Sequence, residues 1–534
     1  MDREGEAGIG ANMPRPPDAA VQETSFAADV PAGDTRTGSG SVLAHDTAAA
    51  WAAKPSSTRA MAPDLLRGVL MALMVLDHSV MQLRSWPHGT SPGGERDSVV
   101  VHEWNRPVAY VVRTLTHLCA PGFTFLLGMG VVFLGRSRAA LGWSWWSLMR
   151  HFVVRTVVLT VTTVLLGLFL SRGKLWFMNI VLFALAVDYL LVGLLWLLLA
   201  KTEPVLAYWI LKVLPDKAQD DASEPLIRSR RGLEAIAPDR KIMRASDASW
   251  HAHNLVLLAM AVATIFWNLG LSPTHGHCAA QQAPLGGTQP AAAAAAAALP
   301  ANDLVRIWFY PVAGTWYVSA FPPLAWLSFA LLGLLYGRVL LARTWSGPAL
   351  ALGNMAVGLA FALLLVLTRL VGFGNLSEGC LQTADQGAHP GRNAYLASAR
   401  SFFYVTKYPP DVAFWALSLG ANHILLAVLG AVPATVAAGP LRPLLAFGRS
   451  ALFFYVVHMV LLTLTGPLFV ALLGHDGTGF RDPMTGRPVD GPAVDQLWGY
   501  FGHWVVVLAI MWPLCEWYAA FKSRTGVHSI WRFF

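Results

Sequence analysis

The stretch from Asp64 to His78, DLLRGVLMALMVLDH, decides the fold class of this chain. It is an apolar run of helical length with ionisable residues near both ends, Asp64 and Arg67 at the start and Asp77 and His78 at the finish. Ionisable groups are costly inside a bilayer and usually mark a functional site there. If the helix enters the membrane at Asp64, His78 lies about 21 Å into a hydrocarbon layer about 30 Å thick. The stretch therefore predicts a membrane helix with a buried polar site.

Two further histidines are expected at a similar depth. A second apolar run, 116–130 (THLCAPGFTFLLGMG), belongs to a helix that crosses back from about Pro107 and places His117 roughly 15 Å below the opposite surface. A later run, 444–472, places His458 roughly 18 Å from the face at which it begins. Three histidines on three helices predict one polar cavity, where imidazole acts as base and imidazolium as acid near neutral pH. The alternative, that each histidine only hydrogen-bonds a neighbouring helix, stays open.

The composition predicts a protein embedded in the lipid bilayer. Hydrophobic residues make up 55% of the 534 residues, charged residues only 13%, and the mean hydropathy is +0.48. A soluble globular domain would contain fewer apolar and more charged residues. The net charge of +8 does not indicate nucleic acid as a partner, because the Lys and Arg residues lie in the segments between the apolar runs. Such a distribution reflects membrane topology.

Ten runs are long and apolar enough to span a bilayer. They predict an all-α, polytopic integral membrane protein with about ten transmembrane helices around a mid-membrane polar cavity. The runs are about 62–83, 107–135, 148–171, 175–200, 251–271, 316–342, 347–371, 410–434, 444–472 and 496–520.

The remaining segments predict the domain organisation. Residues 1–58 are rich in Ala, Pro and Gly without apolar periodicity, so we expect a disordered cytosolic tail. Residues 59–534 form one membrane domain with a cytosolic loop at 201–250 and an outer loop at 272–315. Lys and Arg are in excess in the second, fourth, sixth and eighth connections between the predicted spans, which predicts that both termini lie in the cytosol. The membrane itself is expected to be the plasma membrane or an endomembrane.

Cysteines and isolated polar residues give weaker signals. The four cysteines show no CxxC pair, and a bridge between Cys278 and Cys380 in two outer loops stays open. No HxxxH or ExxH spacing occurs, so we expect no metal site. Asp188 and His423 lie inside apolar runs, and we favour structural hydrogen bonds for both over a role in the polar system. Gly128 and Gly130 indicate close helix packing rather than a nucleotide loop.

Four segments of the sequence resemble, in the same order, the motifs of one known protein family. The segment DLLRG followed by LMVLDH, residues 64–68 and 73–78, resembles the opening helix of the heparan-α-glucosaminide N-acetyltransferase family and its bacterial and fungal relatives. Three further segments follow in the order of that family: THLCAP at 116–121, FFYVTKYPP at 402–410 and FGRSALFFYVVH at 447–458. The similarity runs from about residue 62 to 531, interrupted at 201–250 and 272–303. The wider clan contains membrane acyltransferases that acetylate polysaccharides.

The resemblance implies a membrane-bound acyltransferase. Such an enzyme would move an acetyl group from cytosolic acetyl-coenzyme A to an amine or hydroxyl of a luminal or extracellular acceptor, such as a sugar. The family's animal members place a catalytic His before the second helix, in a pattern resembling HxxWNGxxxxDxxFP. Here that helix reads THLCAP, and the segment 102–105 (HEWN) echoes the pattern with a different spacing to Pro121. The resemblance alone therefore does not assign the catalytic histidine.

Acyl transfer needs a base for the acceptor proton and a donor for the developing oxyanion. We expect His78 to carry the proton, with Asp77 or a backbone group fixing its tautomer, because a neighbouring carboxylate favours the imidazolium that forms. His117 is the next candidate, and His458 helps to complete the chamber. The competing class is a proton-coupled transporter of small molecules, in which the same residues bind solute or protons without making a bond.

Donor binding is expected near the cytosolic face. Arg67 and Arg449 have the charge and fork geometry that suit the phosphates of coenzyme A, and we assign Asp64 and Lys407 to the same role. If the run that holds Arg449 and His458 is one regular helix, the two lie on opposite faces, because nine residues turn it by about 900°. The sequence leaves open the acceptor and whether the chain forms a homo-oligomer.

Overall fold

The structure, a computed structural model, describes residues 61–92, 94–97, 99–214, 240–272, 278, 302–476, 480, 489–526, 529 and 531. This part of the chain is mostly helical, which confirms the all-α class. The predicted tail at 1–58 lies outside the described residues.

Nine segments of the described chain are long and apolar enough to cross a membrane, so the chain is a polytopic membrane protein by helix length and composition. They are Pro107–Ala140, which contains α3 (Pro107–Thr116) and α4 (Cys119–Ala140), α5 (Trp145–Leu170), α6 (Leu182–Val213), α7 (Arg240–Leu271), α10 (Pro323–Ala342), α11 (Gly347–Val371), α14 (Val412–Gly430), α17 (Ala451–Leu473) and α18 (Leu497–Arg524). The tenth predicted run is α2 (Met61–Leu83), which is helical but is not among the nine. The count of ten spans stays a prediction.

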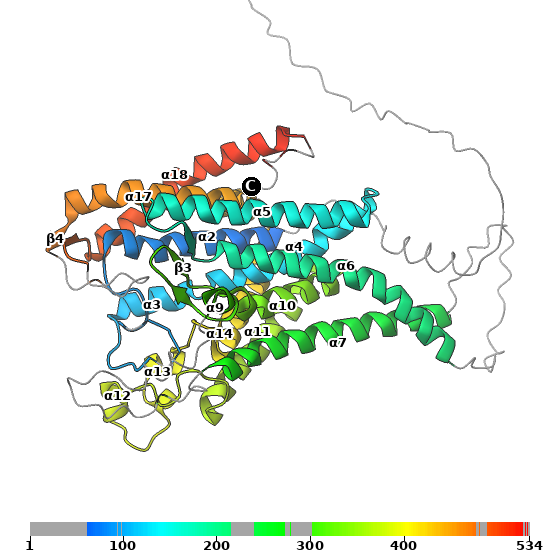
Figure 1. The fold of residues 1–534 in the computed structure, drawn as a ribbon, viewed down its shortest axis with the longest axis horizontal. Helices are drawn as coiled ribbons and strands as arrows, with labels where there is room; N and C mark the ends of the chain where they lie inside the picture. Colours follow the sequence, from blue (N-terminus) through cyan, green and yellow to red (C-terminus); the bar gives the residue numbers. More distant parts are fainter. Residues whose placement is uncertain are drawn as a thin grey trace, which may run out of the picture.

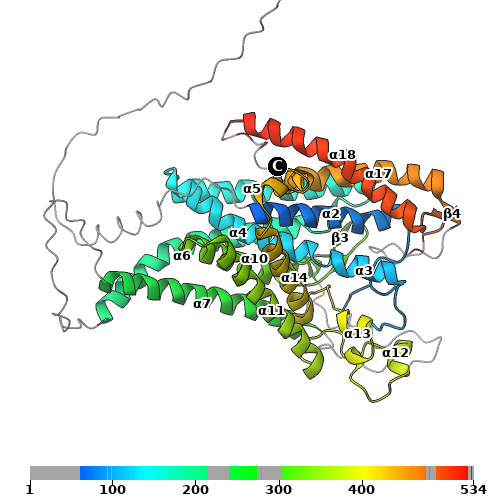
Figure 2. The ribbon, with the colours of Figure 1, turned by 180° about the vertical axis from the view of Figure 1, so that it is seen from behind.

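Helix α2 lies in the middle of the bundle. It contacts α3, α4, α14, α17, α18 and the short α16 (Arg442–Arg449). Figures 1 and 2 show α17 and α18 on one side of α2, and α6, α7 and α10 on the other. Most of its residues are buried, including Asp64 and His78. The polar residues of α2 therefore face protein and not lipid.

Short elements gather at the ends of the helices. One end holds α3, α12 (Ala384–Gly387), α13 (Ala399–Phe403) and the strand β4 (His475–Asp476) (Figure 1). β4 pairs with β5 (Pro492–Ala493). A three-stranded sheet of order β1-β3-β2 joins β1 (Phe177–Asn179), β3 (Tyr317–Ser319) and β2 (Val312–Ala313). β1 runs parallel to β3 with Phe177 opposite Tyr317, and β2 runs antiparallel to it. The other short helices are α9 (Asp303–Phe309), η1 (Ala394–Leu396) and α15 (Ala434–Ala438).

Glycines set the closest helix crossings. A Cβ atom at Gly448 of α16 would lie 1.9 Å from the carbonyl oxygen of Asp64, and one at Gly68 would lie 2.0 Å from that of Leu444. The crossing of α4 and α10 is similar, because a Cβ at Gly128 would lie 2.0 Å from a backbone carbonyl of α10. Only residues without a side chain permit such contact. The packing role predicted for Gly128 is confirmed. The same prediction is wrong for Gly130, where a Cβ atom would meet nothing within 4 Å.

Two predicted helices are broken. The run 107–135 divides at His117 and Leu118, which separate α3 from α4. The run 444–472 divides at Ser450, whose φ of −116° and ψ of 35° depart from helical values. The assumption of one regular helix through Arg449 and His458 is therefore wrong, and their helical phases cannot be compared.

In its described part, residues 201–214 and 240–250, the predicted cytosolic loop 201–250 is mostly helical, because α6 continues to Val213 and α7 begins at Arg240. A buried ion pair stabilises these extensions. Nη2 of Arg338 in α10 lies 2.9 Å from Oε2 of Glu203, and Nε of Arg338 donates to Asn254 at 2.7 Å. A helix can extend past a hydrophobic run where its polar side chains find partners on its neighbours. Of the predicted loop, residues 215–239 lie outside the described residues.

The predicted outer loop 272–315 contains α9 and β2 in its described part. Cys278 of this loop forms a disulfide with Cys380, which confirms the bridge that the sequence left open. Cys119 and Cys515 are free and buried.

Candidate functional site

A cluster of buried polar side chains lies where α2 meets the loops at one end of the bundle. Three structural regions supply it besides α2: loop 84–106, the break between α3 and α4, and the segment before α14. His458 of α17 completes it. The members described below are Asp77, His78, His88, Glu95, Arg113, Thr116, His117, Lys407 and His458.

Arg113 of α3 is the centre of the cluster. Its Nη1 lies 3.0 Å from Oδ1 of Asp77, and its Nη2 lies 3.0 Å from Oε2 of Glu95. The side chain of Arg113 is 3% exposed, that of Asp77 14% and that of Glu95 0%. Thr116 donates to Asp77 at 2.8 Å, and Nε2 of His88 lies 3.1 Å from Oδ2 of the same carboxylate. One guanidinium thus binds two buried carboxylates at once.

Glu95 is an ionised carboxylate with several partners. The backbone N–H and the hydroxyl of Thr90 donate to its Oε1 at 2.7 and 3.1 Å. Burial alone would raise the pKa of Glu95, but the guanidinium of Arg113 and the ring of His117 hold it well below its usual range. The ion pair of Glu95 and Arg113 therefore stays charged across the physiological pH range.

His78 binds His458 and not Asp77. Nδ1 of His78 lies 2.9 Å from Nε2 of His458, across 380 residues of sequence. Nδ1 of His458 lies 3.0 Å from the carbonyl oxygen of Phe454, which can only accept. Neutral His458 therefore carries its proton on Nδ1 and accepts at Nε2, so Nδ1 of His78 donates and Nε2 of His78 keeps a lone pair. The expectation that Asp77 fixes the tautomer of His78 is wrong, because that carboxylate binds Arg113, Thr116 and His88.

Among the three predicted histidines, His78 keeps the most surface. It is 7% exposed, whereas His117 and His458 are 0% exposed. A base must reach the group from which it takes a proton. The free nitrogen of His78 is therefore the best placed of the three to act as a base.

His117 does not join the pair. Its Nε2 lies 3.6 Å from Oε1 of Glu95, which is too long for a hydrogen bond, and its ring packs against Phe414 with the ring centres 5.5 Å apart. Neither ring nitrogen has a hydrogen-bond partner among the described residues. The structure thus joins two of the three predicted histidines, and His117 lies beside the carboxylate system instead.

The four residues predicted to bind the donor divide between the two ends of α2. Arg67 forms the predicted ion pair with Asp64 at 2.9 Å, and Arg449 is exposed at the end of α16. The contact of Gly448 with the backbone of Asp64 brings Arg449 to the same crossing.

Lys407 lies at the other end. Its backbone N–H donates to the carbonyl oxygen of Glu95 at 2.9 Å, and its ammonium group lies over the ring of Tyr408 at 5.4 Å. The residue is 5% exposed. Lys407 therefore lies apart from Arg67 and Arg449, because the chain brings residues 407–410 to loop 84–106. Its assignment to donor binding stays a prediction.

The sequence prediction missed several members of the cluster. Arg113, Glu95 and His88 lie next to the expected residues, but two of them are in a loop whose position depends on the fold. His503 of α18 was also missed. It is 0% exposed and binds Ser79 and Thr465 at 3.2 and 2.9 Å. A histidine inside the apolar run 496–520 was the signal that could have found it.

The other predicted polar positions have mixed outcomes. His423 binds Asn354 at 3.1 Å, which confirms its structural hydrogen bond. Both carboxylate oxygens of Asp188 are buried without a hydrogen-bond partner among the described residues, so the structural bond predicted there is wrong. In segment 102–105, Trp104 donates to Asp385 at 2.8 Å and Asn105 donates to the Gly89 carbonyl at 2.9 Å. That segment holds the loops in place.

No protein-family model matches the chain, and no curated protein matches it either. The residues that the structure describes contain no group of three or more His, Cys, Asp or Glu side chains that could hold a metal ion. Chemically, the site offers an imidazole with a free nitrogen, the ammonium group of Lys407 and a support in which one guanidinium binds two carboxylates.

Proposed function

We propose that this protein is a membrane-bound acyltransferase that moves an acetyl group from cytosolic acetyl-coenzyme A to an amine or hydroxyl of an acceptor on the other side of the membrane, such as a sugar. The observation that carries the proposal is the hydrogen bond between Nδ1 of His78 and Nε2 of His458. It leaves a basic nitrogen on His78, which is 7% exposed within a mostly buried polar cluster. The four motifs that resemble the acetyltransferase family support the same chemistry.

In the proposed reaction, Nε2 of His78 takes the proton of the acceptor as the acceptor attacks the thioester carbonyl. The carbon–sulfur bond then breaks, and the imidazolium returns the proton to the leaving thiolate. His458 supports the imidazolium by accepting the hydrogen bond from Nδ1. The products are the acetylated acceptor and free coenzyme A, so atoms and protons balance.

Lys407 is the proposed oxyanion stabiliser. Its ammonium lies over the rings of Phe321 and Tyr408 at 5.5 and 5.4 Å, and no described residue accepts a hydrogen bond from it. The hydroxyl of Tyr408, the next residue in the chain, lies 3.4 Å from Nη2 of Arg113, and Arg113 binds Asp77, the neighbour of His78 in the sequence. An ammonium with free N–H donors in a site without bulk water stabilises a developing oxyanion strongly.

Donor binding is assigned to Arg67 and Arg449 at the crossing of α2 and α16. Arg67 lies eleven residues before His78, or about 16 Å along the helix. The long pantetheine arm of coenzyme A could bridge such a distance between phosphates at the surface and a thioester at the base.

The test is the release of free coenzyme A thiol by the protein in proteoliposomes with acetyl-coenzyme A and glucosamine acceptors. His78→Ala should lower kcat by roughly 10²- to 10⁴-fold, the usual contribution of a general base, and His458→Ala should also lower kcat. His423→Gln is the matched control, because that histidine is buried in a structural hydrogen bond elsewhere. Arg67→Ala should raise the KM for the donor in a salt-sensitive way. Full activity of His78→Ala would refute the assignment.

A proton-coupled transporter is the second candidate, and one observation favours it. Asp188 of α6 is 0% exposed, and neither carboxylate oxygen has a hydrogen-bond partner among the described residues. Buried carboxyl groups of this kind occur along proton pathways. Solute uptake that depends on a proton gradient, without release of coenzyme A, would establish this alternative.

The proposed orientation places both termini in the cytosol. The charge distribution supports it, and so does the disulfide between Cys278 and Cys380, because disulfides persist on the oxidising side of a membrane. Tags at residue 20 and after Phe534 should be reached by antibody only after the cytosolic side is opened. Glycosylation of an acceptor site placed in 201–250 would contradict this orientation.

A further inference from the structure

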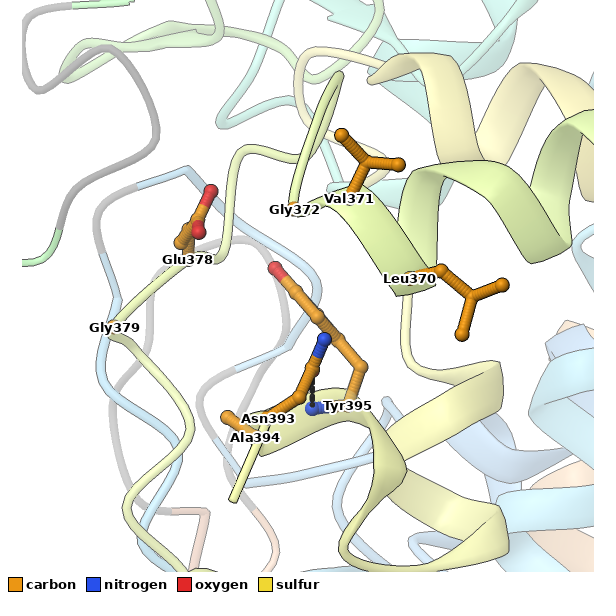
Figure 3. A pocket seen from close by; sticks show the side chains of 8 residues that line it. All are labelled: Leu370, Val371, Gly372, Glu378, Gly379, Asn393, Ala394 and Tyr395. Carbon is orange, nitrogen blue, oxygen red and sulfur yellow. Dashed lines mark hydrogen bonds between the residues drawn. The ribbon is translucent and has the colours of Figure 1, made fainter. Parts of the chain in front are cut away.

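A cavity of about 230 Å³ opens at the end of α11, apart from the histidine cluster. Leu370, Val371 and Gly372 line one side, and Glu378 and Tyr395 line the other. Figure 3 shows the Glu378 side chain across the opening from Leu370 and Val371. No part of the proposed acyl transfer uses this cavity.

The end of α11 leaves two carbonyl groups for a ligand. The helix stops at Gly372, whose φ of 69° is left-handed. Asn375 donates to the carbonyl of Thr368 at 2.9 Å, and Asn393 donates to that of Arg369 at 2.7 Å. The next two carbonyls, those of Leu370 and Val371, accept no hydrogen bond from any described residue. Free carbonyls at a helix C-terminus carry partial negative charge.

Glu378 adds a full negative charge at the same place. A Cβ atom at Gly372 would lie 2.6 Å from its Oε1, so the carboxylate lies directly over the end of the helix. A carboxylate at a helix C-terminus is unfavourable unless a cation lies beside it. No described side chain or backbone N–H donates to this carboxylate.

The buried cation Arg369, which lies behind the lining residue Tyr395, is already committed. Arg369 is 0% exposed and lies 4.5 Å from the centre of the Tyr395 ring. Its guanidinium donates to Asn375 and to the carbonyl oxygens of Phe402 and Tyr404. Arg369 therefore serves the interior and does not pair with Glu378.

The other side of the cavity is apolar and exposed. Leu370 is 56% exposed and Val371 is 73% exposed, at the end of a helix that is long and apolar enough to span the membrane. A ligand here would meet negative charge at its polar end and apolar side chains along the helix. Those are the two halves of a phospholipid whose headgroup ends in an ammonium group.

We propose that this cavity binds the primary ammonium group of an ethanolamine phospholipid whose acyl chains lie along the exposed face of α11. A primary ammonium has three N–H donors, which match the carboxylate of Glu378 and the two free carbonyls. A choline headgroup has the same charge but no N–H donor, so it would leave those carbonyls unpaired. The site selects the lipid by hydrogen bonding as well as by charge.

The test uses the full chain in nanodiscs with equal parts of ethanolamine, choline and glycerol phospholipids. The protein is then released into mild detergent, and the lipid that stays bound is measured by native mass spectrometry. The wild type should retain the ethanolamine lipid in preference to the other two. Glu378→Gln should lower that retention about fivefold, the usual effect of one partly exposed ion pair.

Two variants complete the experiment. Glu103→Gln is the matched control, because it removes the same charge from an exposed position in a different loop and should leave retention unchanged. Ala394→Trp fills the cavity without a change of charge and should lower retention as well, which keeps the proposal testable if Glu378→Gln fails to fold. Equal retention of the choline lipid, or wild-type retention by Glu378→Gln or by Ala394→Trp, would overturn the proposal.

Discussion

Replacement of Arg113 by Met should destabilise the protein strongly. Arg113 is 3% exposed and binds Asp77 and Glu95, at 3.0 Å each. Methionine fills a similar volume but leaves two carboxylates without their cation. Removal of one partner from a buried ion pair costs about 3–5 kcal/mol, because the remaining charge stays buried and uncompensated. We expect a loss of stability in this range.

Thiol labelling can measure this loss. Cys515 is free and 0% exposed, so a thiol reagent reaches it only when the protein opens. With Cys119 replaced by Ala, it is the remaining free cysteine, because Cys278 and Cys380 form a disulfide. When opening is fast and reversible, the labelling rate follows the open population. A loss of 3–5 kcal/mol then corresponds to labelling roughly 10²- to 10⁴-fold faster.

A surface pair provides the control. Arg442 and Glu516 lie 2.6 Å apart, but their side chains are 60% and 30% exposed. Solvent screens such pairs, so Arg442→Met should cost less than about 1 kcal/mol. Addition of Asp77→Asn and Glu95→Gln to Arg113→Met should recover part of the stability, because the buried charges are gone. Wild-type labelling of Arg113→Met, or no recovery in the combined variant, would refute this reasoning.

The other predictions concern a helix crossing, an unpaired carboxylate and an acid titration, all measured by the same labelling. Gly448→Ala should cost about 1–3 kcal/mol, since its Cβ would lie 1.9 Å from a backbone oxygen, whereas Gly130→Ala meets nothing within 4 Å and should cost nothing. Asp188→Leu should slow labelling, because it removes buried oxygens without partners; faster labelling would contradict this. Burial alone would raise the pKa of Glu95, but its ion pair holds it well below 4.5, the value expected in the unfolded chain. The ionised Glu95 therefore contributes its full stabilisation of the folded state above pH 4.5 and loses it as the pH falls through its lower pKa in the folded state. Acid should thus speed labelling less in Glu95→Gln than in the wild type.

The sequence by itself determined the membrane class and most helix positions. A helix in lipid satisfies its backbone hydrogen bonds within its own segment, so a long apolar run is enough to predict it. The ion pair of Asp64 and Arg67 followed from their spacing of three residues, which is also a local property.

Only the tertiary structure decided which polar groups meet. Helix depth placed His78, His117 and His458 at one level, but depth does not say which faces of the helices are in contact. The pairing of His78 with His458 across 380 residues depends on how α2 and α17 pack. Arg113 reaches Asp77 and Glu95 because a loop folds back over α2. These contacts arise from packing between distant segments, and local spacing carries no information about which of those segments become neighbours.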